Sequence, residues 1–351
     1  MSTWFDESRL DDERVLAAHD APLRHLAESG ARVRLTAAEQ AGDPSSERSG
    51  DQGGHGQPRA VVAAGPDARL LRAVLEPWCP VPFVAWPAPS LPGWAGSLDL
   101  VVVLAPDGND HQAASTVAEA VRRGCQVVVA CPPGSLVAEH AAGRWVTVLP
   151  ARPGDQLATA VVVLEHLHDA GLGPSADPEA VAASLDLVAI SCSPHRDIAV
   201  NPAKAGAIAV ADAQVLLWGG SVLAARAARR IAEAVRRTSR SSALAADAEH
   251  LMPILEAASP RSVFDDPVED GAPARPVLVV LDDGGSDELA TARRRELEQL
   301  ATSRGVRVDL LSTDLVPELT GTTSTEVARY AALVLLGRYS AAYLGLGQVE
   351  D

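Results

Sequence analysis

The sequence has 351 residues, 47% of them hydrophobic, and a formal net charge of −16. This length allows two ordinary domains with full cores, and the composition is that of a globular protein. The negative charge argues against nucleic acid or an anionic membrane surface as a partner. No apolar run is long enough to span a membrane, and the acidic N-terminus lacks the apolar core of a signal peptide. We therefore expect a cytoplasmic protein.

The cysteines show no CxxC spacing, so the sequence predicts neither a zinc site nor a disulfide framework. Cys125 and Cys131 bracket a valine-rich segment and are expected to be small buried residues. We expect no metal ion and no cofactor.

The chain opens with an N-terminal helical segment, residues 1–41. Apolar residues at helical spacing predict one helix over about 11–29; they are Val15, Leu16, Leu23 and Leu26. Residues 42–58 are rich in Gly, Ser and Pro and are expected to form a flexible linker.

A first domain is predicted over residues 59–170, where valine-rich strands alternate with helices. The strands are expected at 59–64, 81–86, 98–104, 126–131 and 145–150. The helices are expected at 67–75, 110–123, near 136 and at 154–169. Continuous apolar strands in such an alternation indicate a parallel sheet with helices on both faces.

A second domain of the same kind is predicted over residues 178–351, after a break rich in Gly and Pro. Its strands are expected at 213–218, 276–283 and 306–311, and its helices at 178–190, near 201, at 222–240, 243–257, 286–303 and 325–344. Residues 259–276 read as a polar loop. The fold class is α/β, with two doubly wound domains after the helical segment.

The order of several motifs resembles the SIS (sugar isomerase) domain family, and within it the two-domain phosphoglucose/phosphomannose isomerases. The segments are PVPFVAWPAPSLPGWAGSLDLVVVL, VRRGCQVVVAC, PARPGDQLATAV, NPAKAGAIAV, LLWGGSVLAARAARR and ARYAALVLLGRYSAAYLGLG. The resemblance implies two SIS-like domains, a homodimer, and a sugar phosphate as ligand.

The phosphate loops of the family are altered in this chain. The family carries S-x-S-G-N-T after its third strand, but here residues 105–110 read APDGND, which keeps only Gly108 and Asn109. Asp107 and Asp110 would repel a phosphate by roughly 4 kcal/mol at 4 Å and an effective dielectric near 20, whereas a helix dipole offers about 0.3–1 kcal/mol. One of them is better interpreted as a helix N-cap. The Gly-rich loop after the first strand reads AGPD, which adds a proline and another carboxylate.

The isomerase chemistry requires a base that moves a proton between C1 and C2. The family's glutamate matches a position near Arg237, which cannot act as a base, and Glu233 is the nearby carboxylate. The family's histidine matches the region of His250 and Glu249, out of register. The family's terminal lysine has no counterpart, because Lys204 is the only lysine in the chain.

The remaining binding candidates lie in the second domain. Gly219, Gly220 and Ser221 form a phosphate-type loop before a helix, although a tight turn explains the same residues. Lys204 follows Asn201, a candidate N-cap, and is interpreted as a solvated lysine of the first turn or as a ligand-binding residue.

Two functional interpretations follow. The first is a degenerate SIS-domain protein of sugar-phosphate metabolism that binds a carbohydrate derivative or acts as a regulator, without isomerase activity. The second is an active glucose-6-phosphate/mannose-6-phosphate aldose-ketose isomerase that uses His250, Glu249 or Glu233 in a rearranged site. A nucleotide-binding module is disfavoured because G-x-G-x-x-G is absent.

Overall fold

The computed structural model describes residues 3–42, 57–65, 68–258, 274–285, 287–319 and 325–350. The chain divides into two compact units. The first unit is Ser29–Ala183, and the second unit combines Met1–Glu28 with Ser184–Asp351. Each unit contains its own parallel sheet, which confirms the predicted α/β class. Most of the predicted linker and polar loop, as well as Pro66 and Asp67, lie outside the described residues.

The N-terminal segment is not one helix over 11–29, so that prediction is wrong. After β1 (Thr3–Phe5) and the 3-10 turn η1 (Glu7–Leu10), the chain forms α1 (Glu13–Ala18), α2 (Asp20–Ala27) and α3 (Ser29–Ala41). The first break falls at His19, whose ring Nδ1 lies 2.9 Å from the carbonyl oxygen of Val15 and so meets one of the carbonyls that end α1. Leu23 and Leu26 are buried, as their spacing predicted.

The first unit contains a five-stranded parallel sheet in the order β3-β2-β4-β5-β6. Its strands are β2 (Val61–Ala64), β3 (Phe83–Trp86), β4 (Leu100–Leu104), β5 (Gln126–Ala130) and β6 (Val146–Leu149). Its further helices are α5 (Ala68–Leu75), α6 (His111–Arg122), α7 (Leu136–His140) and α8 (Gln156–Asp169), and α9 (Pro178–Ser191) continues into the second unit.

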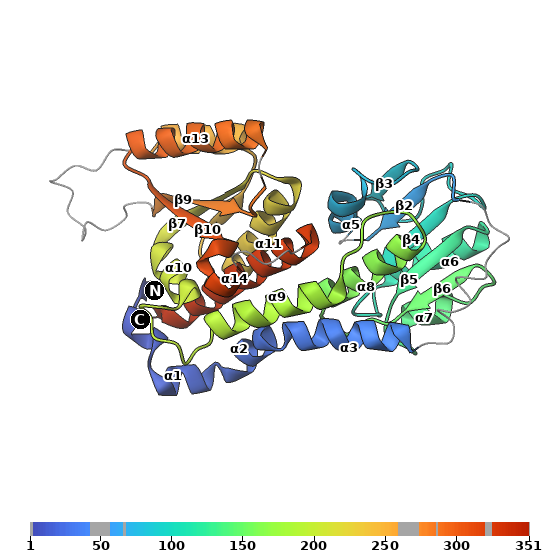
Figure 1. The fold of residues 1–351 in the computed structure, drawn as a ribbon, viewed down its shortest axis with the longest axis horizontal. Coiled ribbons are helices and arrows are strands. Elements are labelled where there is room, and N and C mark those ends of the chain that lie inside the picture. The colour runs from blue at the N-terminus through green and yellow to red at the C-terminus, as the bar shows by residue number, and fades with distance from the viewer. Residues whose placement is uncertain are drawn as a thin grey trace. The chain divides into compact units, whose positions relative to one another are not determined.

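This sheet is covered on both faces at its centre, where every residue of β2 and β4 is apolar and buried. Val101 and Val103 of β4 join a core cluster with residues of α6 and α7, while α5 and α8 pack on the other face (Figure 1). Cys125 and Cys131 are buried within that cluster, as predicted. Strand β2 lies between β3 and β4, so the chain leaves β2 toward one edge of the sheet and later returns on the other side. Such a reversal of strand order is where α/β sheets bind ligands.

The second unit contains a four-stranded parallel sheet in the order β10-β9-β7-β8. Its strands are β7 (Ala213–Gly219), β8 (Ala243–Ala245), β9 (Arg275–Asp282) and β10 (Arg307–Ser312). Its helices are α10 (Pro202–Ala209), α11 (Val222–Ser239), α12 (Ala248–Glu256), α13 (Glu288–Ser303) and α14 (Glu326–Gly347), with short 3-10 turns η2 (Thr313–Leu315) and η3 (Pro317–Leu319).

The prediction of one helix in this unit is wrong at its N-terminal end. The helix expected over 243–257 is instead the edge strand β8 followed by α12. Ala243 pairs with Val215 of β7, so the sheet takes up a segment that intrinsic preference assigns to helix. Helix α13 lies above the sheet and α10, α11 and α14 lie below it (Figure 1).

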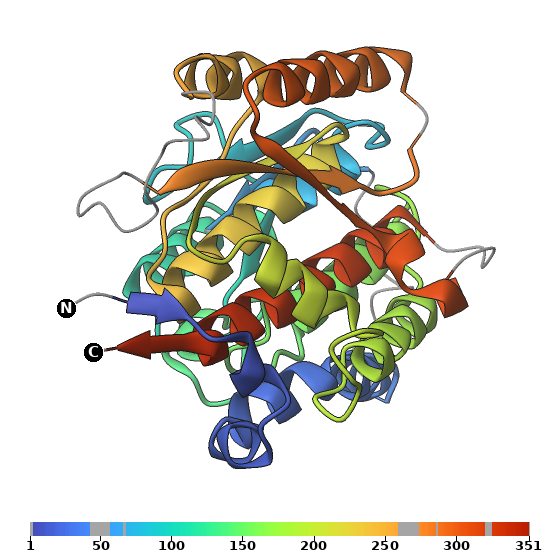
Figure 2. The same cartoon turned by 90° about the vertical axis from the view of Figure 1, so that its left-hand side faces the viewer.

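The two ends of the chain pair with each other in the second unit. β1 is antiparallel to β11 (Gln348–Glu350), with Trp4 opposite Val349, and Figure 2 shows the two strands side by side. Neither strand was predicted from the sequence. Within the described ranges, no helix is long and apolar enough to cross a membrane.

Candidate functional site

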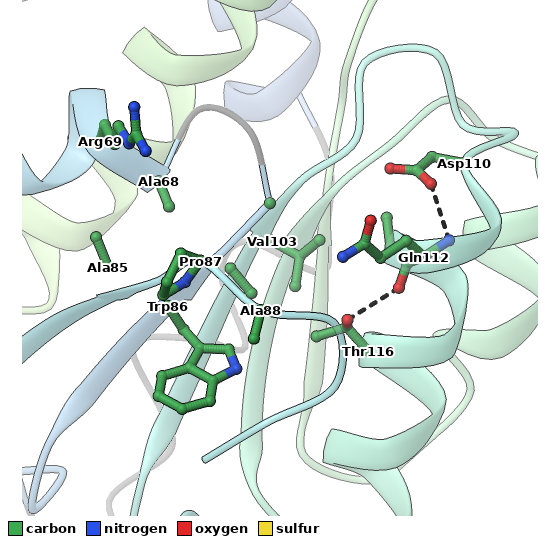
Figure 3. Close-up of a pocket in the computed structure, with 13 residues that line it drawn as sticks. Ala68, Arg69, Ala85, Trp86, Pro87, Ala88, Val103, Asp110, Gln112 and Thr116 are labelled. Atoms are coloured by element: carbon green, nitrogen blue, oxygen red, sulfur yellow. Dashed lines mark hydrogen bonds between the residues drawn. The ribbon is translucent and has the colours of Figure 1, made fainter.

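A pocket of about 330 Å³ lies in the first unit, at the carboxyl ends of β2, β3 and β4 (Figure 3). This is the point where the strand order reverses. Small apolar side chains form much of its wall, with Trp86 and Pro87 at the end of β3. Its polar side chains come from α5 and from the first turns of α6: Arg69, Asp110, Gln112 and Thr116.

The carboxylate of Asp110 caps α6, as predicted. Its Oδ1 accepts a hydrogen bond of 2.8 Å from the backbone N–H of Gln112. The resemblance would require this helix end to donate to a phosphate, yet one of its N–H groups is already bonded to a protein carboxylate. Asp107 is also used within the protein, because its Oδ1 accepts from the backbone N–H of Gly154 at 3.0 Å.

Gly108 and Asn109, the two residues of this loop that match the motif of the resemblance, are not equivalent in the structure. Gly108 has φ +69°, and a Cβ there would lie 2.5 Å from Cβ of Ser135, so the turn requires glycine. Asn109 is exposed. Their assignment as ligand-binding residues stays a prediction.

Three further side chains define the chemistry of the pocket. Arg69 is exposed and stands on the side opposite Asp110 in Figure 3. The side-chain amide of Gln112 turns toward Val103 (Figure 3). Thr116 is buried and donates its hydroxyl hydrogen to the carbonyl oxygen of Gln112 at 2.9 Å, which leaves its oxygen as an acceptor.

Trp86 supplies an aromatic part of the pocket wall. Its indole packs against the core cluster of the unit. Its Nε1 is buried and has no hydrogen-bond partner among the described residues. Because this nitrogen is closed off from solvent, the indole offers the pocket an apolar surface and no accessible donor.

Apart from Asp110, these pocket residues were not predicted from the sequence. Arg69 and Trp86 each lie near the carboxyl end of a strand, which is a position that could have been flagged. Gln112 and Thr116 are four residues apart on α6 and therefore share one face. These two residues line the same pocket as the end of β3 because of the strand order, and the strand order cannot be recognised from a local sequence pattern.

The Gly219–Ser221 loop of the second unit is a tight turn that also faces a carboxylate. Ser221 caps α11 by accepting from the N–H of Ala224 at 2.9 Å, and its hydroxyl donates to Asp283 Oδ2. A Cβ at Gly219 would lie 2.3 Å from the carbonyl carbon of Ala224, and one at Gly220 would lie 2.9 Å from Ala290. Each of the two loops that the resemblance links to phosphate therefore has a carboxylate in it or beside it. Binding by these three residues stays a prediction.

The catalytic candidates of the alternative interpretation lie on two helices of the second unit. Glu249 and His250 are exposed neighbours on α12, and successive helical side chains point about 100° apart. Glu233 lies on α11, where its carboxylate accepts from Arg230 at 3.0 Å. No hydrogen bond or ion pair between described residues joins these three side chains, and their catalytic role stays a prediction.

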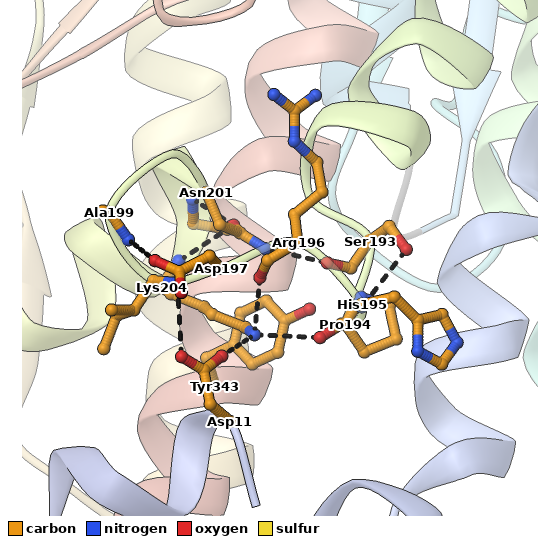
Figure 4. A network of polar contacts seen from close by, with 12 residues as sticks. Asp11, Ser193, Pro194, His195, Arg196, Asp197, Ala199, Asn201, Lys204 and Tyr343 are labelled. Carbon is orange, nitrogen blue, oxygen red and sulfur yellow. Dashed lines mark hydrogen bonds and ion pairs between the residues drawn. The ribbon is translucent and has the colours of Figure 1, made fainter. Parts of the chain in front are cut away.

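Lys204 is not a solvated lysine, so that interpretation is wrong. Its side chain is fully buried, and Nζ donates to Asp11 Oδ1 at 2.5 Å, to the carbonyl oxygen of Pro194 at 2.9 Å and to that of Arg196 at 2.8 Å (Figure 4). These acceptors match the three N–H bonds of an ammonium group. The predicted N-cap is confirmed, because Asn201 accepts from the backbone N–H of Ala203 at 3.0 Å.

Comparison with known proteins identifies the fold. A scan of protein-family models and a search of curated proteins find no match. Among solved structures, the chain is similar to tagatose-6-phosphate ketose/aldose isomerase from Escherichia coli, with a TM-score of 0.66, 13% identity and 92% of each chain covered. It is also similar to the C-terminal domain of glucosamine-fructose-6-phosphate aminotransferase from Francisella tularensis, with a TM-score of 0.60, 10% identity, and 92% of this chain and 94% of that chain covered.

A third structure is a glucose-6-phosphate isomerase-like protein from Thermus thermophilus, with a TM-score of 0.51, 17% identity, and 96% of this chain and 92% of that chain covered. At these identities the likeness establishes the fold. The predicted α/β fold, with parallel sheets flanked by helices, is thereby confirmed.

Proposed function

We propose that this protein is a degenerate SIS-fold protein that binds a carbohydrate derivative, without isomerase activity, and acts as a regulator in sugar-phosphate metabolism as a homodimer. The observation that carries the proposal is the carboxylate of Asp110, which caps α6 where the family resemblance puts a phosphate. The solved structures of the same fold include a tagatose-6-phosphate isomerase and a glucose-6-phosphate isomerase-like protein, which supports sugar metabolism as the setting.

The electrostatics of both phosphate-type loops support the loss of phosphosugar chemistry. Asp283 accepts the Ser221 hydroxyl in the second unit, so that hydroxyl is already committed within the protein. Asp282 beside it is paired with Arg294 at 2.7 Å, and hydrogen bonds to Glu298 and Asp282 raise the pKa of this guanidinium. The positive charge of Arg294 is therefore already balanced by the carboxylates of Asp282 and Glu298.

A coupled assay tests the absence of catalysis. We expect no turnover of fructose-6-phosphate, glucose-6-phosphate or mannose-6-phosphate above the rate without protein, because the candidate base Glu233 is held by Arg230. Thermal-shift measurements with the same compounds test binding separately from turnover. A stabilised protein that turns nothing over would support the proposal.

The active isomerase remains the alternative, and matched variants distinguish it from a contaminating activity. Turnover that disappears in His250→Ala or Glu249→Gln would contradict the proposal. The control is His140→Ala, which removes an exposed histidine from the end of α7 in the first unit. An activity that His140→Ala retains and His250→Ala loses belongs to this chain.

A further inference from the structure

We infer that the pocket at the carboxyl ends of β2, β3 and β4 binds an uncharged monosaccharide and selects against its phosphate ester. The inference rests on the proposed function and names the ligand class of this site. It differs from the phosphate recognition that the family resemblance implies, because it assigns to the pocket the neutral part of a sugar.

The charge of the described lining residues carries the first step. Arg69 and Asp110 are the only ionisable side chains among them, and they stand on opposite sides of the pocket (Figure 3). Their formal charges cancel. A neutral ligand gains hydrogen bonds from both, whereas a phosphate placed at the end of α6 would meet the Asp110 carboxylate. The chain as a whole carries −16, which adds repulsion against any anion.

The hydrogen-bonding capacity of the pocket carries the second step. The amide of Gln112 both donates and accepts, Arg69 donates, and the second carboxylate oxygen of Asp110 accepts. Thr116 adds an acceptor, because its hydrogen already bonds to the carbonyl oxygen of Gln112. Sugar hydroxyls both donate and accept, so they complement this mixed set. A phosphate only accepts, and would leave the two acceptor groups without a partner.

The size and the wall of the pocket carry the third step. About 330 Å³ lies at the lower end of the range for small-molecule sites, which suits one sugar ring and is too small for a dinucleotide. Trp86 and Pro87 offer flat apolar surfaces to the C–H face of a ring. Alanines line the space around them and leave room for it; they are Ala64, Ala68, Ala85, Ala88 and Ala113.

Binding is tested by NMR on protein with ¹⁵N-labelled tryptophan. The indole signal of Trp86 is assigned by its disappearance in Trp86→Phe, and the full chain is titrated with glucose, fructose and mannose and with their 6-phosphates. We expect one of the free hexoses to shift the Trp86 signal, with a Kd about tenfold or more below that of its 6-phosphate, which corresponds to about 1.4 kcal/mol.

A charge variant tests why the phosphate is rejected. Asp110→Asn keeps a side-chain oxygen for the N-cap and removes the charge. We expect the preference for the free hexose over its 6-phosphate to narrow by about tenfold. The matched control is Asp287→Asn, which changes the N-cap of α13 in the second unit and should leave the preference unchanged.

Two outcomes would overturn the inference: equal or tighter binding of the 6-phosphate by the unmodified protein, or no Trp86 shift with any free hexose. Both leave the proposed function open to its own test. Thermal stabilisation by a sugar phosphate, together with no Trp86 shift by any free hexose, would preserve the proposed function and refute this pocket. Isomerase turnover would refute the proposed function. The NMR titration would still measure whether the pocket prefers a free hexose to its 6-phosphate.

Discussion

Lys204 owes its burial to acceptors that come from separate parts of the chain. Asp11 lies in the N-terminal segment, and the carbonyl groups of Pro194 and Arg196 precede α10. The ammonium group also lies 5.5 Å from the ring of Tyr343, on α14. A charge held in this way is stable only while all of its partners are in place, because a buried ion without them is costly.

Lys204→Met should therefore destabilise the protein. We expect the free energy of unfolding to fall by about 3 kcal/mol, because the ion pair is lost and two carbonyl groups lose their donor. Asp11→Asn should cost less, because the amide oxygen still accepts from Nζ. Urea denaturation followed by circular dichroism measures both.

The control for these variants is Asp20→Asn, which removes an exposed ion pair with Arg24. Its effect should stay within about 0.5 kcal/mol. A Lys204→Met protein as stable as this control would show that the network contributes nothing to stability.

The four cysteines are free, and their environments predict unequal reactivity. Burial raises the pKa of Cys125, of Cys131 and, to about 12, of Cys192, so these thiols stay protonated near neutral pH. Cys79 is only partly buried. We expect Ellman's reagent to modify one thiol per native chain, and the others only after denaturant is added.

The control is Cys79→Ser, which should abolish the fast reaction. Rapid modification of a second thiol in the native protein would mean that the cores of the two units open more readily than their burial indicates.

At the scale of elements, α11 and α14 approach closely because glycines face the contact. A Cβ at Gly345 would lie 2.6 Å from the carbonyl oxygen of Thr238. The hydroxyl of Thr238 in turn donates to the carbonyl oxygen of Ala341 at 2.7 Å, which ties the two helices together.

Gly345→Ala should force these helices apart. We expect a loss of about 1–3 kcal/mol in the free energy of unfolding, because a backbone oxygen cannot move aside as a side chain can. Thermal unfolding measures it against Gly93→Ala, a position with nothing within 4 Å of an added Cβ and no positive φ. Equal melting temperatures for the two variants would contradict this account of the contact.

The elements that the sequence predicts well are those whose pattern is local. Valine-rich runs such as Leu100–Leu104 are typical of buried strands, and they appear where expected. Strands of three residues have no such local pattern. Ala243–Ala245 resembles the start of a helix, and the partner of Thr3–Phe5 lies at the opposite end of the chain. Neither pairing can be recognised from a window of neighbouring residues.

At the scale of the molecule, the same distinction separates what could be predicted of the site from what could not. The N-cap at Asp110 follows from a turn before a helix, which a short stretch of sequence shows. The pocket needs the order β3-β2-β4, since its lining comes from three strand ends and two helices. Lys204 is buried because Asp11 of the N-terminal segment lies against α10 and accepts from its ammonium group. This contact between distant parts of the chain is why the prediction of a solvated lysine was wrong.

The pairing of β1 with β11 has a consequence for how the protein is made. The ribosome releases β1 long before β11 exists, while Ser29–Ala183 emerges as one continuous piece with a complete sheet. During synthesis the first unit can fold as soon as it leaves the exit tunnel, whereas the strand at the start of the chain must wait for its partner. Throughout that interval Trp4 and the unpaired edge of β1 are open to chaperones and to other nascent chains.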